Sequence, residues 1–417
     1  MRITRRNLLR SLALTGASAM LSPAFGQDGG SIFDMFSRNR VLREANPEGA
    51  SAAAQQMIQT TEPILSYDTA NNLQMAIAQY EPFVAAGGWE QIPQGVYGLR
   101  LGNERREAVA LKRRLMSSAD MPYRDRVDDM VDGDTDAAIR LFQARHGLQI
   151  TGQVDEATFY ALAVPASERL QQLHLNLQRV NAMAARIDPR YVVVNIPAAS
   201  IEAVEQGTVV QRHVAVVGRA DRATPILQSR IHQINFNPYW HVPTSIIRND
   251  LIRLMNEDPT YLTRYSIRIF DGSGNEVPPT SINWQTEEAV RYQFRQDPGA
   301  ENSMGHVKIN FHNPHNVYLH DTPTRALFAE NARFHSSGCV RVEGVNHLVS
   351  WLLRDDGWDL GQVETAFASG DRRDQGISNP VPIHTTYISA WANRQGTVSF
   401  RDDVYQFDAQ GKITFEA

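Results

Sequence analysis

The sequence predicts an α+β protein whose main domain is a β-sandwich or barrel-like unit from about residue 190 to residue 366. Segments rich in Val and Ile recur in this part at near-regular spacing, separated by turn residues: YVVVNIP, TVVQRHVAVVG, HQINFNPYWHVP and VKINFHN. Before residue 187, in contrast, apolar residues recur at helical spacing. A chain of 417 residues with 42% hydrophobic content can bury about two or three such modules.

The first residues have the layout of an export signal. Arginines precede an apolar run from Leu12 to Leu21, and small residues follow it. The run is about half of the ~20 residues that a membrane-spanning helix needs, so we expect residues 1–26 to be a cleaved signal peptide. The pair Arg5-Arg6 resembles a twin-arginine signal, with a general secretory signal as the alternative. Either route predicts export to the periplasm or cell envelope.

The charge of the chain limits its partners. Residues 1–26 hold four arginines and no acidic residue, so their removal takes the formal net charge from −5 to −9. A chain this acidic has no electrostatic reason to bind nucleic acid. No later stretch resembles a membrane span. We therefore expect no nucleic-acid partner and no membrane span, with a monomer as the default.

Four segments precede the strands. Residues 27–65 are rich in small and polar residues with little apolar pattern, which predicts a flexible tether or a partly ordered lead-in. Residues 66–100 predict a helical scaffold segment that glycines and a proline turn bring to an end. Residues 101–165 predict a compact helical domain, and residues 166–189 a long amphipathic helix that leads into the strands.

The helical domain should contain about three short helices. Ala138, Leu141 and Phe142 form a stripe at i, i+3 and i+4. Gly147 follows the expected end of that helix, and Asp155 can cap a last short one.

The stretch AIRLFQARHGLQITGQVDEATFYAL resembles the peptidoglycan-binding-domain-like module. The resemblance lies in its Phe-Gln, Gly-Leu, Gly, Thr and Leu positions, and the stretch departs from the module at Gln149-Ile150-Thr151. A glycan-binding domain and a helical spacer of the same fold are both consistent with it.

The most informative stretch is HVKINFHNPHNVYLHDTPTRALFAENARFHSSGCVRVEG, which contains the only cysteine of the chain together with five histidines. A thiol is a strong nucleophile only as a thiolate, so a catalytic cysteine needs a nearby imidazole or positive charge. His320 follows the apolar segment NVYL, and Cys339 follows the small-residue turn Ser336-Ser337-Gly338. Backbone N–H groups of such a turn can form an oxyanion hole. The spacing predicts Cys339 as the nucleophile and His320 as the general base.

These residues resemble the signature of the L,D-transpeptidase family with a YkuD-type catalytic domain. In that signature a strand-end His is followed by a loop, a Ser-x-Gly-Cys turn and an Arg. The matching positions are His320, Ser336, Gly338, Cys339 and Arg341. The family usually has His where this chain has Ser337. The Ser-Ser-Gly-Cys turn and the Leu-His-Asp-Thr-Pro strand end are similar to a YcbB-like subgroup, and this resemblance covers most of the chain from about residue 65.

The resemblance implies acyl transfer in peptidoglycan without a cofactor or metal ion. The Cys339 thiolate would attack the bond between the third residue of a donor tetrapeptide stem and its terminal D-alanine, releasing D-alanine and forming a thioester. An amine of an acceptor stem would then attack the thioester and make a 3-3 crosslink, with His320 moving the proton in each step. The N–H groups of Gly338 and Cys339 would stabilise the oxyanion. Carbapenem-type inhibitors are expected to acylate Cys339.

Three neighbours are candidates for supporting this chemistry. Arg341 is expected to orient the turn or a substrate carboxylate, since a guanidinium suits bidentate contacts. His335 can tune the thiol or be an ordinary loop histidine. Asp321 can orient His320, a role that a backbone carbonyl fills at many such sites.

The remaining candidates concern the shape of the site. Ser336 and Ser337 can be simple turn formers. Tyr318 and Leu319 point to opposite faces of a strand, so one of them should line the cleft.

Two further segments complete the organisation. Residues 244–304 form a long connection with a helical piece, SIIRNDLIRLMNED. The resembling subgroup has a capping subdomain at this place, which predicts either a lid or a packing insertion without motion. Residues 380–417 include two strand-like segments that are expected to pack on the catalytic domain.

Three other functions stay open. A zinc hydrolase would use the histidines and Cys339 as ligands, but no His-Glu-x-x-His or Cys-x-x-Cys pair is present, so no metal site is expected. An L,D-carboxypeptidase or other cysteine hydrolase of cell-wall peptides would pass the thioester to water. A non-catalytic cell-wall binding protein would have lost its catalytic residues. The intact pair of His320 and Cys339 argues against this alternative.

Overall fold

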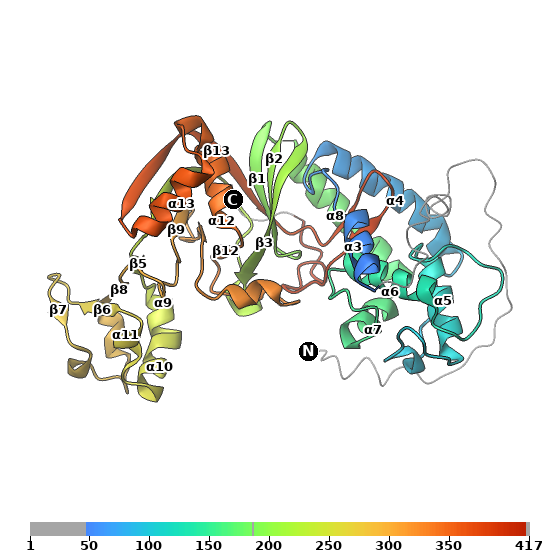
Figure 1. The fold of residues 1–417 in the computed structure, drawn as a ribbon, viewed down its shortest axis with the longest axis horizontal. Coiled ribbons are helices and arrows are strands. Elements are labelled where there is room, and N and C mark those ends of the chain that lie inside the picture. Colours follow the sequence, from blue (N-terminus) through green and yellow to red (C-terminus); the bar gives the residue numbers. More distant parts are fainter. Residues whose placement is uncertain (1–46, 186, 414–417) are drawn as a thin grey trace.

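The computed structural model describes residues 47–185 and 187–413. The predicted signal peptide, residues 1–26, and the first part of the lead-in lie outside the described residues. Figure 1 shows a helical region, a central sheet with helices beside it, and a small lobe that protrudes from the sheet. The fold is α+β, as the sequence predicts. None of the described helices is long and apolar enough to cross a membrane.

The helical region begins earlier than expected. Helix α3 (Pro47–Ile58) packs against α6 (Gly133–Arg145), where Ala54 shares a core with Leu141 and Ala144. Leu65 is fully buried, and its carbonyl oxygen accepts a hydrogen bond from the Tyr191 hydroxyl at 2.6 Å. Residues 47–65 therefore differ from the predicted flexible tether, because they contribute apolar side chains to packed cores. The helices of the region are α3 (Pro47–Ile58), α4 (Tyr67–Ala85), η2 (Gln94–Val96), α5 (Glu107–Ser117), α6 (Gly133–Arg145), α7 (Glu156–Ala163) and α8 (Ala166–Ala184).

Helices α5, α6 and α7 share one apolar core and form the expected three-helix unit. The side chain of Asp155 accepts the Thr158 N–H at 2.8 Å and caps α7, as predicted. Gly147, with φ of +67°, follows the end of α6. Gln143 is fully buried, and its amide accepts the N–H groups of Thr151 and Gly152. This glutamine of the Phe-Gln pair therefore holds the turn between α6 and α7.

The central sheet has nine strands in the order β11-β3-β12-β10-β9-β4-β13-β1-β2. Strand β3 also pairs with β2, so every strand except β11 belongs to a closed circuit, in agreement with the barrel-like expectation. The pairs β1–β13, β10–β12 and β11–β3 are parallel. The strands are β1 (Arg190–Asn195), β2 (Ser200–Glu205), β3 (Thr208–Gly218), β4 (Gln228–Phe236), β9 (Val307–Phe311), β10 (Leu319–His320), β11 (Phe334–Ser336), β12 (Val340–Val342) and β13 (Arg373–Thr386).

The core of this sheet lies between its strands and the helix α12 (Val345–Leu353), with α13 (Leu360–Ser369) alongside. Leu348 and Leu352 of α12 are fully buried, and each such side chain stabilises the fold by about 1.5–3 kcal/mol. Strands β1 and β2 are buried on both faces. Val192 joins this core, whereas Val193 packs against α4 and α8. The central sheet and the helical region thus share these two strands.

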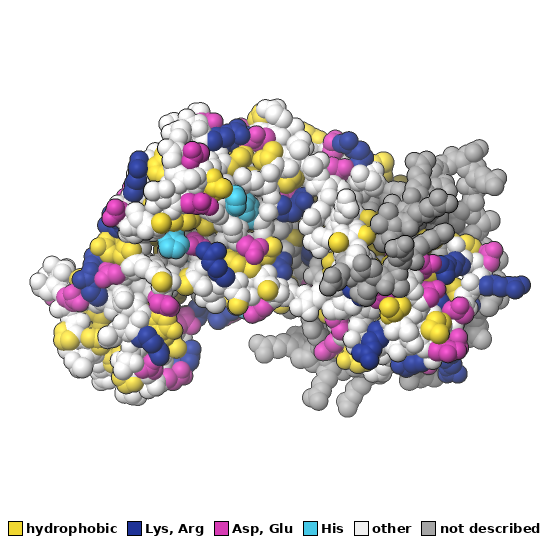
Figure 2. Space-filling view, in the orientation of Figure 1, with side chains coloured by type: hydrophobic (Ala, Val, Ile, Leu, Met, Phe, Trp, Pro, Cys, Tyr) yellow, Lys and Arg dark blue, Asp and Glu magenta, His cyan; other side chains and the backbone are white. Residues whose placement is uncertain are grey.

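The predicted capping insertion is a lobe with a sheet and a core of its own. Its four strands have the order β5-β8-β6-β7, and its core includes Leu251, Met255, Leu262 and Phe294. Figure 2 shows the lobe protruding from the main body, with acidic and basic side chains interspersed over the described part of this face. Its elements are β5 (Trp240–His241), α9 (Thr244–Ile246), η4 (Ile247–Leu251), α10 (Ile252–Glu257), α11 (Tyr261–Arg264), β6 (Ile267–Phe270), β7 (Glu276–Val277), η5 (Pro279–Ser281), η6 (Glu287–Arg291) and β8 (Gln293–Gln296).

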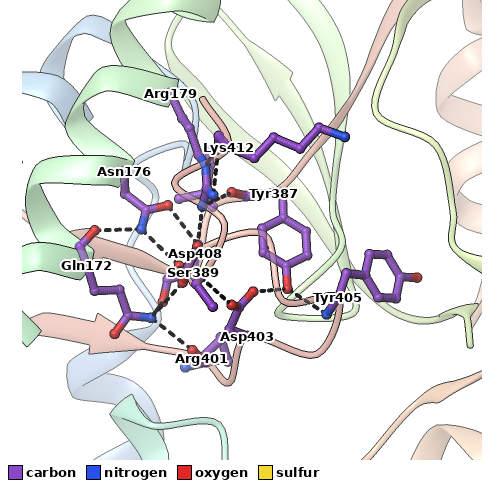
Figure 3. Close-up of polar contacts among 12 residues, drawn as sticks. Gln172, Asn176, Arg179, Tyr387, Ser389, Arg401, Asp403, Tyr405, Asp408 and Lys412 are labelled. Atoms are coloured by element: carbon purple, nitrogen blue, oxygen red, sulfur yellow. Dashed lines mark hydrogen bonds and ion pairs between the residues drawn. The ribbon is translucent and has the colours of Figure 1, made fainter. Parts of the chain in front are cut away.

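The C-terminal segment is divided between two regions. Residues 380–386 belong to β13 and pair with β1 and β4 in the central sheet, as expected, whereas the strands that follow pack elsewhere. Strands β14 (Ala390–Ala392) and β15 (Val398–Phe400) form a hairpin whose apolar side chains lie against α4 and α8 of the helical region. Figure 3 shows the polar contacts after the hairpin, where the Asp408 carboxylate accepts hydrogen bonds from Arg179 of α8 and from Ser389. The C-terminal segment therefore ties the helical region to the end of β13.

Candidate active site

Three neighbouring strands place ionisable side chains in one row. Strand β10 pairs with β9 and β12, and His320 lies opposite Lys308 of β9 and Arg341 of β12. Side chains at opposite positions share a face of the sheet, so these three lie side by side. Leu319 and Val340 point to the other face and are fully buried in the core. The alternation of apolar and polar residues along each strand thus produces the row.

Cys339 occupies the next position along this face. The Val340 N–H donates to the Tyr318 carbonyl oxygen at 3.1 Å, which places Cys339 beside Tyr318. The Cys339 side chain is half-buried, and its Sγ lies 4.0 Å from the Asn316 carbonyl oxygen. The ring of Tyr318 lies edge-on to the His320 ring, with 5.6 Å between the centroids. Of the predicted pair Tyr318 and Leu319, the tyrosine is therefore the one on the site face.

The thiol is neutral in the resting protein. Burial raises the pKa of Cys339 above its usual value, although hydrogen bonds from the backbone and side chain of Tyr318 and the charges of Lys308 and Arg341 oppose this effect. Formation of a thiolate here would therefore require a base that takes the proton.

The His320 ring is held in one tautomer by a backbone hydrogen bond. Its Nδ1–H donates to the Asp321 backbone carbonyl oxygen at 2.6 Å, which leaves Nε2 as the acceptor. Burial, followed by the charge of Arg341, lowers the pKa of His320 to about 3. The imidazole is therefore neutral near pH 7, with Nε2 unprotonated. The group that orients it is the backbone carbonyl of Asp321.

The turn before the nucleophile is tightly held. Ser336 is buried; its hydroxyl accepts the Gly338 N–H at 3.1 Å and donates to the Cys339 carbonyl oxygen. Thr224 Oγ1 donates to the Gly338 carbonyl oxygen at 2.9 Å. Gly338 has φ of +113°, a conformation that favours glycine. Of the two predicted oxyanion donors, the Gly338 N–H is thus already engaged, whereas the Cys339 N–H has no partner among the described residues.

Ser337 connects the turn to the capping lobe. Its Oγ accepts a hydrogen bond from Arg222 Nη1 at 2.9 Å. The same guanidinium forms an ion pair of 2.6 Å with Asp250 of η4 in the lobe. One arginine therefore contacts both the nucleophile turn and the lobe.

Two of the predicted supporting side chains have other partners. The Asp321 carboxylate accepts the His306 N–H at 3.0 Å and lies 3.6 Å from Arg325. His335 Nε2 pairs with Glu330 at 2.7 Å on the solvent side of β11. The structure therefore gives neither side chain a contact with Cys339 among the described interactions.

The histidines do not gather around the cysteine. The ring of His312 stacks on His232, with 4.0 Å between centroids. In the part of the chain that the structure describes, no group of three or more His, Cys, Asp or Glu side chains could hold a metal ion.

Lys308 and Trp240 are two site residues that we did not assign from the sequence. Lys308 Nζ lies 4.4 Å from the Tyr318 ring centroid, and burial lowers the pKa of this lysine. Burial, with Cys339 nearby, raises the pKa of Tyr318, and a hydrogen bond from Trp240 of β5 partly opposes this. The available signal was the alternation in VKINF, which puts Lys308 on the face opposite the core residues Val307 and Ile309.

Comparison with known proteins defines the class. Residues 189–383 match the family described as the L,D-transpeptidase catalytic domain, and residues 105–162 match the family described as a putative peptidoglycan binding domain. The first range contains the whole site. Residues 189–383 are therefore similar to the L,D-transpeptidase catalytic domain, and residues 105–162 of the same chain are similar to a peptidoglycan-binding domain.

A curated relative agrees with this class. A Haemophilus influenzae protein described as a putative L,D-transpeptidase is 34% identical over 244 residues, which are 58% of this chain and 48% of that protein. The chain thus spans about half the length of that relative.

Solved structures are more distant. An L,D-transpeptidase from Stackebrandtia nassauensis is 14% identical with a TM-score of 0.26. The match covers 72% of this chain and 97% of the Stackebrandtia chain. One from Mycobacterium smegmatis is 12% identical with a TM-score of 0.24, covering 48% and 58%. The L,D-transpeptidase LdtMt1 in complex with imipenem is 14% identical with a TM-score of 0.23, covering 48% and 59%. The assignment rests on the family matches and not on these structures.

Proposed function

We propose that this protein is an L,D-transpeptidase that forms 3-3 crosslinks in peptidoglycan through a thioester on Cys339. The observation that carries the proposal is the pairing of strands β10 and β12. It puts His320 and Cys339 on one face of the sheet, while the Asp321 carbonyl fixes the imidazole tautomer that can accept a proton.

In the first step, His320 Nε2 takes the thiol proton while Cys339 Sγ attacks the carbonyl carbon before the terminal D-alanine of a donor tetrapeptide. The tetrahedral intermediate carries a negative oxygen, toward which the Cys339 N–H can donate. The C–N bond then breaks, and His320 returns its proton to the leaving amine. The products are D-alanine and a thioester.

In the second step, the side-chain amine of the third residue of an acceptor stem attacks the thioester. His320 accepts a proton from this amine and returns it to the sulfur as the C–S bond breaks, which regenerates the neutral thiol. The first step begins from a neutral thiol and a neutral imidazole, and the second from a neutral amine and a neutral imidazole. The mechanism therefore does not require a thiolate–imidazolium ion pair in the resting protein.

The accompanying domains support action at the cell wall. The domain at residues 105–162 belongs to a family described by peptidoglycan binding. Together with the predicted signal peptide, it supports export to the periplasm or cell envelope. The Leu319-His320-Asp321-Thr322-Pro323 strand end and the Ser-Ser-Gly-Cys turn support placement in the YcbB-like subgroup.

The test is turnover of purified disaccharide tetrapeptide by the exported form of the chain, followed by mass spectrometry. We expect a crosslinked dimer lacking one D-alanine, and none with Cys339→Ala or His320→Gln. His335→Gln is the matched histidine control and should retain activity, since His335 pairs with Glu330. Tripeptide alone would identify an L,D-carboxypeptidase, and no product dependent on Cys339 would refute catalysis.

Inhibitor binding offers a second measurement. A carbapenem should add its mass once to the intact protein, and Cys339→Ala should abolish this adduct. Cys339 is the only cysteine of the chain, so the site of acylation is unambiguous.

A further inference from the structure

Two cationic side chains flank the catalytic pair without a carboxylate partner. Lys308 and Arg341 lie on either side of His320 in the row across β9, β10 and β12. Among the described residues, neither side chain interacts with an Asp or Glu, and Arg341 Nε is buried without a hydrogen-bond acceptor. Other arginines near the site do have such partners, as the pair Arg222–Asp250 shows.

Unpaired charges in such a position are costly. Removing an ammonium or guanidinium from water requires a compensating charge or hydrogen bonds. Burial lowers the pKa of both Lys308 and Arg341, and the only charge that opposes this effect is a thiolate at Cys339. The resting thiol is neutral, so the counter-charge is absent until a ligand or the reaction supplies it.

Activation of the thiol does not account for the two cations. Their charges lower the pKa of Cys339, but burial outweighs them and the thiol stays protonated. The row of cations beside His320 contains a buried donor without an acceptor, Arg341 Nε, which an anion arriving with the substrate can satisfy.

The position of Lys308 fits such an anion. Its Nζ lies 4.4 Å from the centroid of the Tyr318 ring. Tyr318 lies beside Cys339, because the Val340 N–H donates to the Tyr318 carbonyl oxygen. In the donor, the leaving nitrogen and the terminal carboxylate are attached to the same Cα atom, so a scissile bond at Sγ brings this carboxylate into the same neighbourhood.

We propose that Lys308, with Arg341, forms a carboxylate subsite for the chain-terminal carboxylate of the acyl donor. The subsite rests on the proposed function, and it restricts cleavage to the last peptide bond of a stem. A donor that continues beyond the leaving residue would lack a negative charge there and would leave both cations unpaired.

Matched donors test the subsite in turnover. One donor carries a free terminal carboxylate and the other a terminal carboxamide. We expect the free acid to be preferred, and Lys308→Met to lower kcat/KM for the free acid by about 10- to 100-fold with the loss mainly in KM. The carboxamide should change less than about threefold, and Lys308→Arg should restore part of the preference. An equal loss on both donors would overturn the proposal, because it would assign Lys308 to the thiol or the oxyanion.

Alkylation of Cys339 tests the subsite independently of turnover. We expect the ratio of the alkylation rate with iodoacetate to the rate with neutral iodoacetamide to be higher for Cys339 than for a free small thiol. Lys308→Met should remove this preference for iodoacetate. Lys412→Met is the matched control, since Lys412 Nζ also lies 4.5 Å from an aromatic ring, that of Phe407, but does not act on the pKa of Cys339. If the preference for iodoacetate is found but no crosslinked product forms, the proposed function is refuted and the subsite is not. Crosslinking without any preference in wild type would refute the subsite alone.

Discussion

The Nδ1–H of His320 donates to the backbone carbonyl oxygen of the next residue, Asp321, at 2.6 Å. The hydrogen-bond partner of the imidazole is thus a backbone carbonyl, and the Asp321 side chain has other partners. Its carboxylate holds the Gly305–His306 turn, where a Cβ on Gly305 would lie 2.3 Å from Asp321 Oδ2.

Asp321→Ala should therefore affect stability more than chemistry. The substitution leaves the partly buried His306 N–H without its acceptor, which costs up to about 1–3 kcal/mol. We expect a lower melting temperature, with the rate of Cys339 acylation in the folded protein reduced less than about tenfold. Asp321→Asn keeps an acceptor oxygen, and its melting temperature should lie between those of the wild type and Asp321→Ala. A loss of acylation as large as that of His320→Gln would contradict the assignment of the backbone carbonyl as the orienting group.

The pH dependence of thiol alkylation should show a neutral resting pair. The pKa of Cys339 is raised, so the thiolate fraction grows only as the pH passes above the ordinary thiol range. Iodoacetamide reactivity is therefore expected to rise still at pH 9, without a plateau between pH 5 and 8. The pKa of His320, about 3, predicts that protonation of the base limits turnover only in strong acid. A plateau near neutrality would instead indicate a thiolate paired with imidazolium.

The contact from Arg222 to both Asp250 and Ser337 should influence acylation. Arg222→Ala removes an ion pair of 2.6 Å to the lobe and a hydrogen bond of 2.9 Å to the turn. Partly exposed pairs contribute about 0–1 kcal/mol, so little stability should be lost. We expect a decrease of about two- to tenfold in the carbapenem acylation rate. Arg248→Ala, which removes the exposed pair with Glu287 in the same lobe, is the control and should have no effect. Equal rates for both variants would show that the Arg222 contacts are only structural.

The sequence predicted the site residues that lie within one motif. Cys339 and the Ser336-Ser337-Gly338 turn are contiguous, and His320 ends the nearest apolar strand. Lys308 could not be assigned in the same way, because only the register of β9 against β10 brings it beside His320. Trp240 reaches Tyr318 from the edge of the lobe, across a long stretch of chain.

Short strands were the main difficulty for the fold. Strands β5 and β7 have two residues each, too few for an alternating pattern, so the sheet of the lobe was not predicted. The hairpin of β14 and β15 was expected on the catalytic domain. Its partners in α4 and α8 are more than 200 residues earlier in the chain, and apolar spacing alone does not identify a partner.

Tyr405 should support the nucleophile turn from the C-terminal segment. Its hydroxyl donates to the Gly218 carbonyl oxygen at 2.6 Å and accepts the Thr224 N–H at 3.2 Å, and Thr224 in turn holds Gly338. Tyr405→Phe leaves a buried carbonyl and a buried N–H unpaired, which should cost about 1–3 kcal/mol. We expect a lower melting temperature and slower carbapenem acylation of Cys339, because the loop that fixes the turn loses its anchor. Tyr292→Phe is the control: it removes only the 3.4 Å contact with Glu288 in the lobe, and it should leave the acylation rate unchanged. If Tyr405→Phe lowers the melting temperature without slowing acylation, the segment stabilises the fold but does not position the nucleophile.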